Sequence, residues 1–212
     1  MESPTNMLLL LIIPINFFIL GSSRLGACIR TTALQGSILA LISFLMHPVS
    51  GHTLFLSGSA LALKGVLMPN LLFRAIRQVQ IRREIEPLIG YVPTLILGTL
   101  AMAGAFIFSD YLPLIEAHRG SLIIPVGLST LVTGFLMLTT RRKALTQVLG
   151  YLIFENGVFI FGILLADAMP LMVEAGILLD LLVAIFVMGI IINQINREFS
   201  SMDVEDLSSL RE

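Results

Sequence analysis

Long apolar segments follow one another along this chain and are separated only by short polar stretches. Hydrophobic residues make up 56% of the sequence and charged residues 13%, whereas a soluble domain carries about 25% charged residues. A membrane-spanning helix needs about 20 mostly apolar residues, and several segments meet this length. The pattern excludes a soluble enzyme and a nucleic-acid binder, and it predicts an all-α polytopic membrane protein.

Seven segments are predicted to cross the membrane, within a single transmembrane domain over residues 1–196. The predicted helices cover residues 5–22, 31–48, 52–73, 88–109, 121–140, 144–166 and 170–195. The first segment is interpreted as a retained helix, because the residues before it lack the basic stretch of a signal peptide. The last residues, 197–212, form an acidic tail that we expect in the cytoplasm.

Lys and Arg mark one side of the predicted membrane domain. The loops that alternate along the chain hold Arg24, Arg30, Arg74, Arg77, Arg82, Arg83, Arg141, Arg142 and Lys143, and the tail holds Arg197 and Arg211. The opposite side has only Arg119, and Lys64 lies inside a predicted helix. Because basic loops remain in the cytoplasm, this distribution predicts the N-terminus outside and the C-terminus inside.

Ionisable residues within the predicted helices are the candidate functional residues. They are Lys64, Glu155, Glu174 and Asp180. A charge at the bilayer centre costs about 2.5–3.5 kcal/mol on insertion scales, so such residues usually face a protein interior or a water-filled path. At 1.5 Å per residue, Lys64, Glu155 and Asp180 lie roughly 15–18 Å deep, near the midplane, whereas Glu174 lies near the outer surface.

The helix around Glu155 carries further polar side chains. Gln147 and Tyr151 precede Glu155 at i, i+4 spacing and share its stripe, and Asn156 lies beside it. Gly150, Gly157 and Gly162 are expected to permit close helix packing. One interpretation is a proton path through Glu155, Asp180 and Lys64, with Glu174, Asn156, Tyr151 and Gln147 as further candidates. The other is a structural ion pair, for instance Lys64 with Asp180.

Cofactor and metal sites are not expected in this chain. Cys28 is the one cysteine, and a lone thiol cannot build an iron–sulfur or thiolate zinc site. His47, His52 and His118 fall at the outer ends of helices or in outer loops, which does not suit axial haem ligation. The basic residues at 74–83 are interpreted as a topology signal that contacts lipid headgroups or a partner.

Two segments resemble a known family. The Phe-Glu-Asn-Gly segment at 154–157 and the Leu-Leu-Asp-Leu-Leu segment at 178–182 are similar to the hydrogenase-4 membrane component E family. That family occurs in formate hydrogenlyase-type and related group 4 nickel–iron hydrogenases. Its C-terminal half is similar to the K-type subunit of respiratory complex I and to the C-type subunit of Mrp antiporters. In the K-type subunit, two membrane glutamates are implicated in proton transfer. The resemblance implies that Glu155 is the counterpart of the first, and Asp180 is chosen by depth as the counterpart of the second.

The resemblance implies a multi-pass subunit of a complex in a prokaryotic cytoplasmic membrane, without a catalytic centre of its own. Antiporter-like and quinone-chamber-like membrane subunits would be its neighbours. The nickel–iron centre and the iron–sulfur clusters would belong to the partner subunits of the soluble hydrogenase arm. Two alternatives stay open: a subunit of an Mrp-like cation/proton antiporter, and a structural scaffold with no direct proton role.

The predicted orientation can be tested with reporters fused to the C-terminus. We expect a fusion to a reporter that works only in the cytoplasm to be active, because the basic loops place that end inside. Activity of a periplasmic reporter alone would contradict the orientation.

Overall fold

A computed structural model shows that the described part of the chain is a bundle of helices without strands. The structure describes residues 4–46, 51–79, 87–112, 121–165 and 189. The elements are α1 (Pro4–Gly21), α2 (Leu25–Met46), α3 (Gly51–Ala60), the π-helix η1 (Leu61–Leu67), α4 (Met68–Val79), α5 (Tyr91–Tyr111), α6 (Ile123–Thr140) and α7 (Ala144–Leu165). The all-α class is therefore confirmed.

Six helices of the described residues are long and apolar enough to cross a membrane, counting α3, η1 and α4 as one span. They correspond to the first six predicted helices, and the seventh, 170–195, falls almost entirely outside the described residues. Two helices are longer than predicted at their basic ends. Helix α2 begins at Leu25 and α4 continues to Val79, so Arg30, Arg74 and Arg77 lie on helices and not in loops. Long basic side chains tolerate this position because their charged ends reach water.

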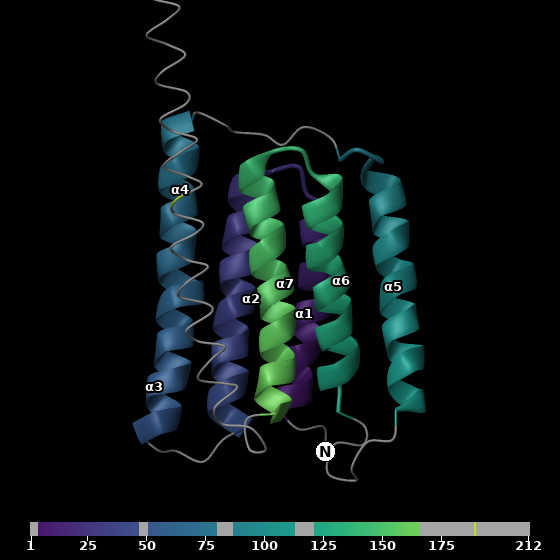
Figure 1. Cartoon of the computed structure of the whole chain (residues 1–212). Helices are drawn as coiled ribbons and strands as arrows, with labels where there is room; N and C mark the ends of the chain where they lie inside the picture. Colours follow the sequence, from purple (N-terminus) through teal and green to yellow (C-terminus); the bar gives the residue numbers. More distant parts are fainter. Residues whose placement is uncertain (1–3, 47–50, 80–86, 113–120, 166–188, 190–212) are drawn as a thin grey trace, which may run out of the picture.

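The helices run side by side, with α1, α2, α6 and α7 in the middle (Figure 1). The continuous helix α3–η1–α4 lies at one edge and contacts α2, whereas α5 lies at the other edge and contacts α1 and α6. The edge helix α5 exposes Val92, Ile96, Leu100, Ile107 and Phe108. Helices that are apolar on their outward side are typical of proteins surrounded by lipid or by other membrane subunits.

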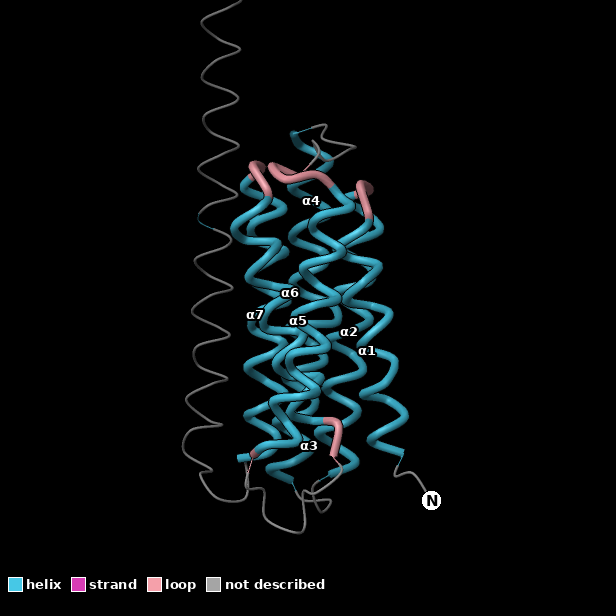
Figure 2. Tube along the Cα trace, turned by 90° about the vertical axis from the view of Figure 1, so that its right-hand side faces the viewer, coloured by secondary structure: helices cyan, strands magenta, loops and turns pink. Residues whose placement is uncertain are grey.

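One end of the bundle collects the basic residues, and we call it the basic end. The turns between α1 and α2 and between α6 and α7 lie there, as does the start of α5 (Figure 2). It carries Arg24, Arg30, Arg74, Arg77, Arg141, Arg142 and Lys143. Helix α4 is amphipathic at this end, because Arg74 and Arg77 are exposed while Leu72 and Ala75 are buried. The grouping that the sequence predicted on one side is thus present in the fold.

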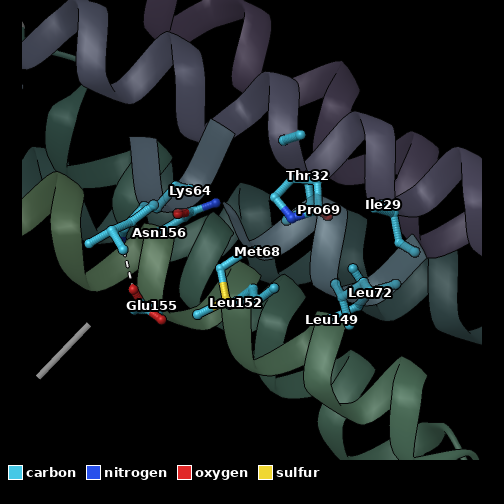
Figure 3. A pocket seen from close by; sticks show the side chains of 12 residues that line it. Ile29, Thr32, Lys64, Met68, Pro69, Leu72, Leu149, Leu152, Glu155 and Asn156 are labelled. Atoms are coloured by element: carbon cyan, nitrogen blue, oxygen red, sulfur yellow. Dashed lines mark ion pairs between the residues drawn. The ribbon is translucent and has the colours of Figure 1, made fainter. Parts of the chain in front are cut away.

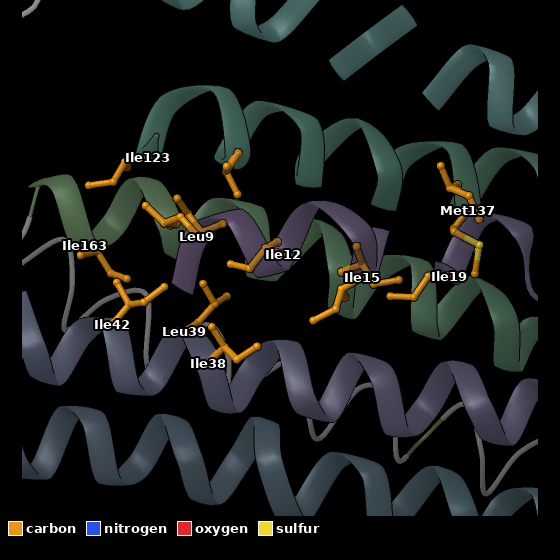
Figure 4. Close-up of a cluster of buried hydrophobic side chains, with 14 residues drawn as sticks. Leu9, Ile12, Ile15, Ile19, Ile38, Leu39, Ile42, Ile123, Met137 and Ile163 are labelled. Carbon is orange, nitrogen blue, oxygen red and sulfur yellow. The ribbon is translucent and has the colours of Figure 1, made fainter. Parts of the chain in front are cut away.

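Two apolar clusters form the core. The first joins α1, α2, α6 and α7 through residues that include Ile12, Leu39, Val126 and Ile160 (Figure 4). The second joins α2, α4 and α7 near the basic end. We call them the central cluster and the basic-end cluster, and the candidate site lies where they meet.

Helices α6 and α7 approach each other most closely, through glycines. A Cβ atom added at Gly157 would lie 2.7 Å from the backbone nitrogen of Leu131, and one added at Gly150 would lie 2.8 Å from that of Leu138. Small residues let the backbones of membrane helices approach, which confirms the expectation for these two positions. Gly162 is different, because a Cβ there meets nothing within 4 Å.

Replacing Gly157 by Ala is expected to separate α6 from α7. The new methyl group would press on helix backbone that cannot move independently, and overpacking costs about 1–3 kcal/mol. Gly104→Ala is the matched control, because a Cβ at Gly104 meets nothing within 4 Å. Thermal unfolding in detergent should show a lower midpoint for Gly157→Ala alone. Equal midpoints for both variants would contradict the close approach.

Candidate functional site

The π-helix η1 presents Lys64 to the inside of the bundle. Lys64 lies in the middle of the element Leu61–Leu67 and is only 8% exposed. A π-helical turn inside an α-helix is rare and often occurs at functional sites, because its wider turn displaces side chains from the regular α-helical positions. The neighbouring residues Leu61, Val66 and Leu67 are exposed, so the same turn separates an apolar outer face from a charged inner one.

Lys64 forms a buried ion pair with Glu155 of α7. Its Nζ atom lies 3.0 Å from Oε1 of Glu155, and Glu155 is 6% exposed. The same ammonium group lies 4.7 Å from the ring centre of Phe159, one turn further along α7. The face of an aromatic ring attracts a cation, so the ring and the carboxylate both stabilise the charge of Lys64. Figure 3 shows the pair among the side chains around it.

A glycine contact allows Lys64 to reach α7 from the edge of the bundle. Helix α2 lies against η1, and a Cβ added at Gly36 would lie 2.8 Å from the Cβ of Lys64. A Cβ added at Gly65 would lie 2.9 Å from Oγ of Ser37, so the approach is tight from both sides. Larger residues at these positions would move η1 outward. The ion pair therefore depends on Gly36 and Gly65 as well as on the charged residues.

A chain of buried hydrogen bonds starts beside Glu155 and crosses four helices. Asn156 of α7 donates from Nδ2 to Oε1 of Gln35 on α2 at 3.3 Å, and Gln35 donates from Nε2 to Oδ1 of Asn16 on α1 at 2.9 Å. Asn16 donates from Nδ2 to the hydroxyl of Thr130 on α6 at 2.9 Å, and that hydroxyl donates to the carbonyl of Val126 at 2.7 Å. We call this series the amide chain. Its four side chains are at most 2% exposed.

The structure brings together part of the predicted site. Lys64 and Glu155 form the pair, and Asn156 lies next to it, as part of the amide chain. Gln147 is exposed at the basic end, where its Nε2 donates to the carbonyl of Arg141 at 3.1 Å, and Tyr151 packs against the basic-end cluster. Gln147 and Tyr151, which were predicted to share a stripe with Glu155, thus lie outside the site. Asp180 and Glu174 lie outside the described residues.

The sequence predicted Asn156 but not the other members of the amide chain. Asn16, Gln35 and Thr130 carry no charge and lie far from Glu155 in the sequence. The available signal was the presence of Asn and Gln inside strongly apolar segments, since a buried amide needs a partner within the bundle. Among the described residues, no group of three or more His, Cys, Asp and Glu side chains could hold a metal ion.

Arg141 has a structural role that its place in a basic turn did not predict. Its side chain is 2% exposed, and its Nη2 atom donates to the carbonyl of Leu20 at 2.9 Å. Leu20 lies in the last turn of α1, whose carbonyls have no partner within the helix. The guanidinium group also lies 5.2 Å from the ring centre of Tyr91. Arg141 therefore joins the ends of α1 and α6 to the start of α5, while Arg142 is exposed.

Removing one member of the ion pair is expected to cost more than removing both. Lys64→Met leaves the carboxylate of Glu155 without the ammonium group, and breaking a buried pair costs about 3–5 kcal/mol. The double variant Lys64→Met/Glu155→Leu should recover most of this loss. Unfolding in detergent gives the free energies, with Lys143→Met at the basic end as the control for losing a lysine. Additive losses in the double variant would show that the two residues do not interact.

Comparison with known proteins identifies relatives over most of the chain. Hydrogenase-4 component E of Escherichia coli K12 is 30% identical over 177 residues, which cover 82% of this chain and 80% of the relative. The Shigella flexneri hydrogenase-4 component E matches equally well. An uncharacterized protein of Mycobacterium tuberculosis is 31% identical over 193 residues, covering 89% of this chain and 87% of that protein.

Other comparisons add no further family or structure. No family model matches the chain, and no solved structure matches it. The identity to the enterobacterial proteins extends over most of both chains and agrees with a bundle of apolar helices. The chain therefore belongs to the hydrogenase-4 component E family.

Proposed function

We propose that this chain is a non-redox membrane subunit of a hydrogenase complex and that its Lys64–Glu155 pair takes part in proton translocation. Membership of the hydrogenase-4 component E family supports the first part. The buried pair supports the second, and it is the single observation on which that part rests. Ionisable residues inside membrane helices are rare because their insertion is costly, and those that occur often mark ion pathways and proton relays.

The position of the pair suits a step in a proton path. Glu155 lies eleven residues from the start of α7 at Ala144, which corresponds to about 16 Å of helix and places it near the middle of a ~30 Å hydrocarbon core. The surrounding apolar clusters separate it from both ends of the bundle. A proton at this depth can be carried by titratable groups and by bound water, and Glu155 is such a titratable group in α7.

Protonation and pairing would be coupled at Glu155. When the carboxylate takes up a proton it loses its charge, so its attraction for the ammonium group of Lys64 weakens. When it releases the proton, the 3.0 Å pair forms again. A partner subunit that moves Lys64 or Glu155 would therefore favour either the paired or the unpaired state. It would do so because its interaction energy with the two states differs.

The amide chain would position the carboxylate and would not carry protons. Primary amides neither gain nor lose protons near neutral pH, unlike carboxylates and amines. Asn156 is bonded through Gln35 and Asn16 to α6, and this fixes α7 next to Glu155. Interhelical hydrogen bonds of this kind contribute about 0.6 to 2 kcal/mol each in membranes.

Electron transfer would belong to other subunits of the complex. The nickel–iron centre and the iron–sulfur clusters would be held by the soluble arm, and antiporter-like and quinone-chamber-like subunits would lie beside this chain in a prokaryotic cytoplasmic membrane. Helix α5 supports such contacts, because it lies at an edge and exposes a row of large apolar side chains. An Asp180 contribution to the proton path belongs to the same proposal.

Glu155→Gln tests the proton role. Glutamine keeps the size of the side chain but cannot exchange a proton, so we expect the intact complex to lose most of its donor-driven proton translocation in membrane vesicles. Asp110→Asn is the matched control, because it makes the same change at an exposed acid at the end of α5. Assembly is followed by co-purification of this chain with its partners.

Two results would contradict the proposal. Full translocation by an assembled Glu155→Gln complex would leave the pair with a structural role only. Co-purification of the wild-type chain with antiporter subunits alone, without a nickel-binding subunit, would contradict the hydrogenase context.

A further inference from the structure

A small cavity lies directly beside the ion pair. It has a volume of about 20 Å³ and is lined by residues of α2, η1, α4 and α7, with Lys64, Glu155 and Asn156 among them (Figure 3). A cavity needs about 10–15 Å³ by this measure to hold one water molecule, provided that polar partners are present. The size and the polar lining therefore both suit a single water.

The cavity extends from the pair toward one end of the bundle. Its other lining residues include Ile29 and Thr32 on α2, Met68 and Leu72 on α4, and Leu149 and Leu152 on α7. Helices α2 and α7 begin at the basic end and α4 ends there, so these residues lie between the pair and the basic end. The cavity thus lies on the basic-end side of the pair.

The buried hydroxyl of Thr32 is independent evidence for a water in this cavity. Its side chain is buried at 6% exposure, and its hydroxyl has no hydrogen-bond partner among the described residues. Other buried threonines, such as Thr130 and Thr133, donate to the carbonyl four residues earlier in their helix. A buried hydroxyl without a partner is rare and costs free energy, and an internal water is the usual partner. Thr32 lines the cavity that could hold this water.

On α2 and α7, apolar side chains pack on the opposite side of the pair, whereas α3 places the buried hydroxyl of Ser57 on that side. Leu39 and Ile42 of α2 and Ile160 and Ile163 of α7 are buried in the central cluster, between the pair and the other end of the bundle. The ring of Phe159 lies over the ammonium group on the same side. The packed aliphatic region between α2 and α7 gives a water molecule no partner, so that region stays dry.

We propose that the cavity holds a water that bonds to the Thr32 hydroxyl and to the Lys64–Glu155 pair, and that protons reach the pair from the basic end. This inference deepens the proposed function and, in its statement about protons, rests on it. Leu72 and Leu149 of the basic-end cluster form the barrier that must open transiently. The water itself and the direction of access can be measured without proton translocation.

Radiolytic footprinting of the wild-type complex tests the water. Hydroxyl radicals formed from a bound water oxidise the side chains next to it, and methionine sulfur is a sensitive target. Met68 lines the cavity and is 4% exposed, while Met137 is 1% exposed in the central cluster. We expect several-fold faster oxidation of Met68, measured on peptides by mass spectrometry. Equal rates would overturn the proposal of a cavity water.

Cysteine labelling tests the side of access. In a Cys28→Ser background, Thr32→Cys places a thiol in the cavity, and Leu39→Cys places one two turns along α2 in the central cluster. A small cationic methanethiosulfonate is added to vesicles of either orientation, and labelling is measured on this chain. We expect Thr32→Cys to react several-fold faster from the basic-end side than Leu39→Cys does from either side. Equal reactivity, or reaction of Thr32→Cys from the opposite side alone, would overturn one-sided access.

The outcomes separate this inference from the proposed function. Suppose that Met68 and Thr32→Cys react faster, as expected, but that the Glu155→Gln complex translocates protons fully. This result would support the hydrated cavity and overturn the proton role. Loss of translocation in Glu155→Gln, together with equal oxidation of Met68 and Met137, would support the proton role and overturn the cavity water. If the Thr32→Cys complex does not assemble, the footprinting of the wild-type complex still decides whether the water is present.

Discussion

A positive and a negative side chain face each other within an apolar bundle, and much of the architecture follows from keeping them together. Each charge alone would cost about 2.5–3.5 kcal/mol in the middle of a membrane, so each requires the other. Lys64 lies on the edge helix α3–η1–α4, and Glu155 lies on the central helix α7. The π-helical turn and the close approach at Gly36 bring the ammonium group within 3.0 Å of the carboxylate. The pair thus couples an edge helix to the centre.

The same requirement shapes the uncharged polar residues. Asn16, Gln35, Thr130 and Asn156 form a single hydrogen-bonded series, because an amide in this environment has no water to bond with. The series and the ion pair occupy adjacent residues of α7, so the site is a polar layer between two apolar clusters. Along α2 and α7 the layer is asymmetric, because the Thr32 hydroxyl and the cavity lie toward the basic end and packed aliphatic side chains lie toward the other end.

Sequence alone predicted much of the fold and the charged part of the site. The apolar segments located the six spans of the described residues to within a few residues at most ends, because length and hydropathy set what a membrane helix can be. The larger differences, at the start of α2 and the end of α4, arise because the exposed residues Arg30, Arg74 and Arg77 lie on the helices and so did not mark the helix ends. The partner of Lys64, the amide chain and the burial of Arg141 could not be predicted, since they depend on which helices are neighbours.

The sequence by itself determined that the described helices are long and apolar enough to cross a membrane, that one end of the described bundle carries the basic residues, and that Lys64 and Glu155 lie within such helices. These properties follow from the local order of residues and from the thickness of the bilayer. Only the tertiary structure decided that Lys64 faces Glu155, that Gln35 connects Asn156 to Asn16, and that a small cavity extends from the pair toward the basic end. Interhelical contacts of this kind depend on glycine approaches and on the rotation of each helix about its axis. In helices that are apolar on nearly all sides, residue order alone does not set that rotation.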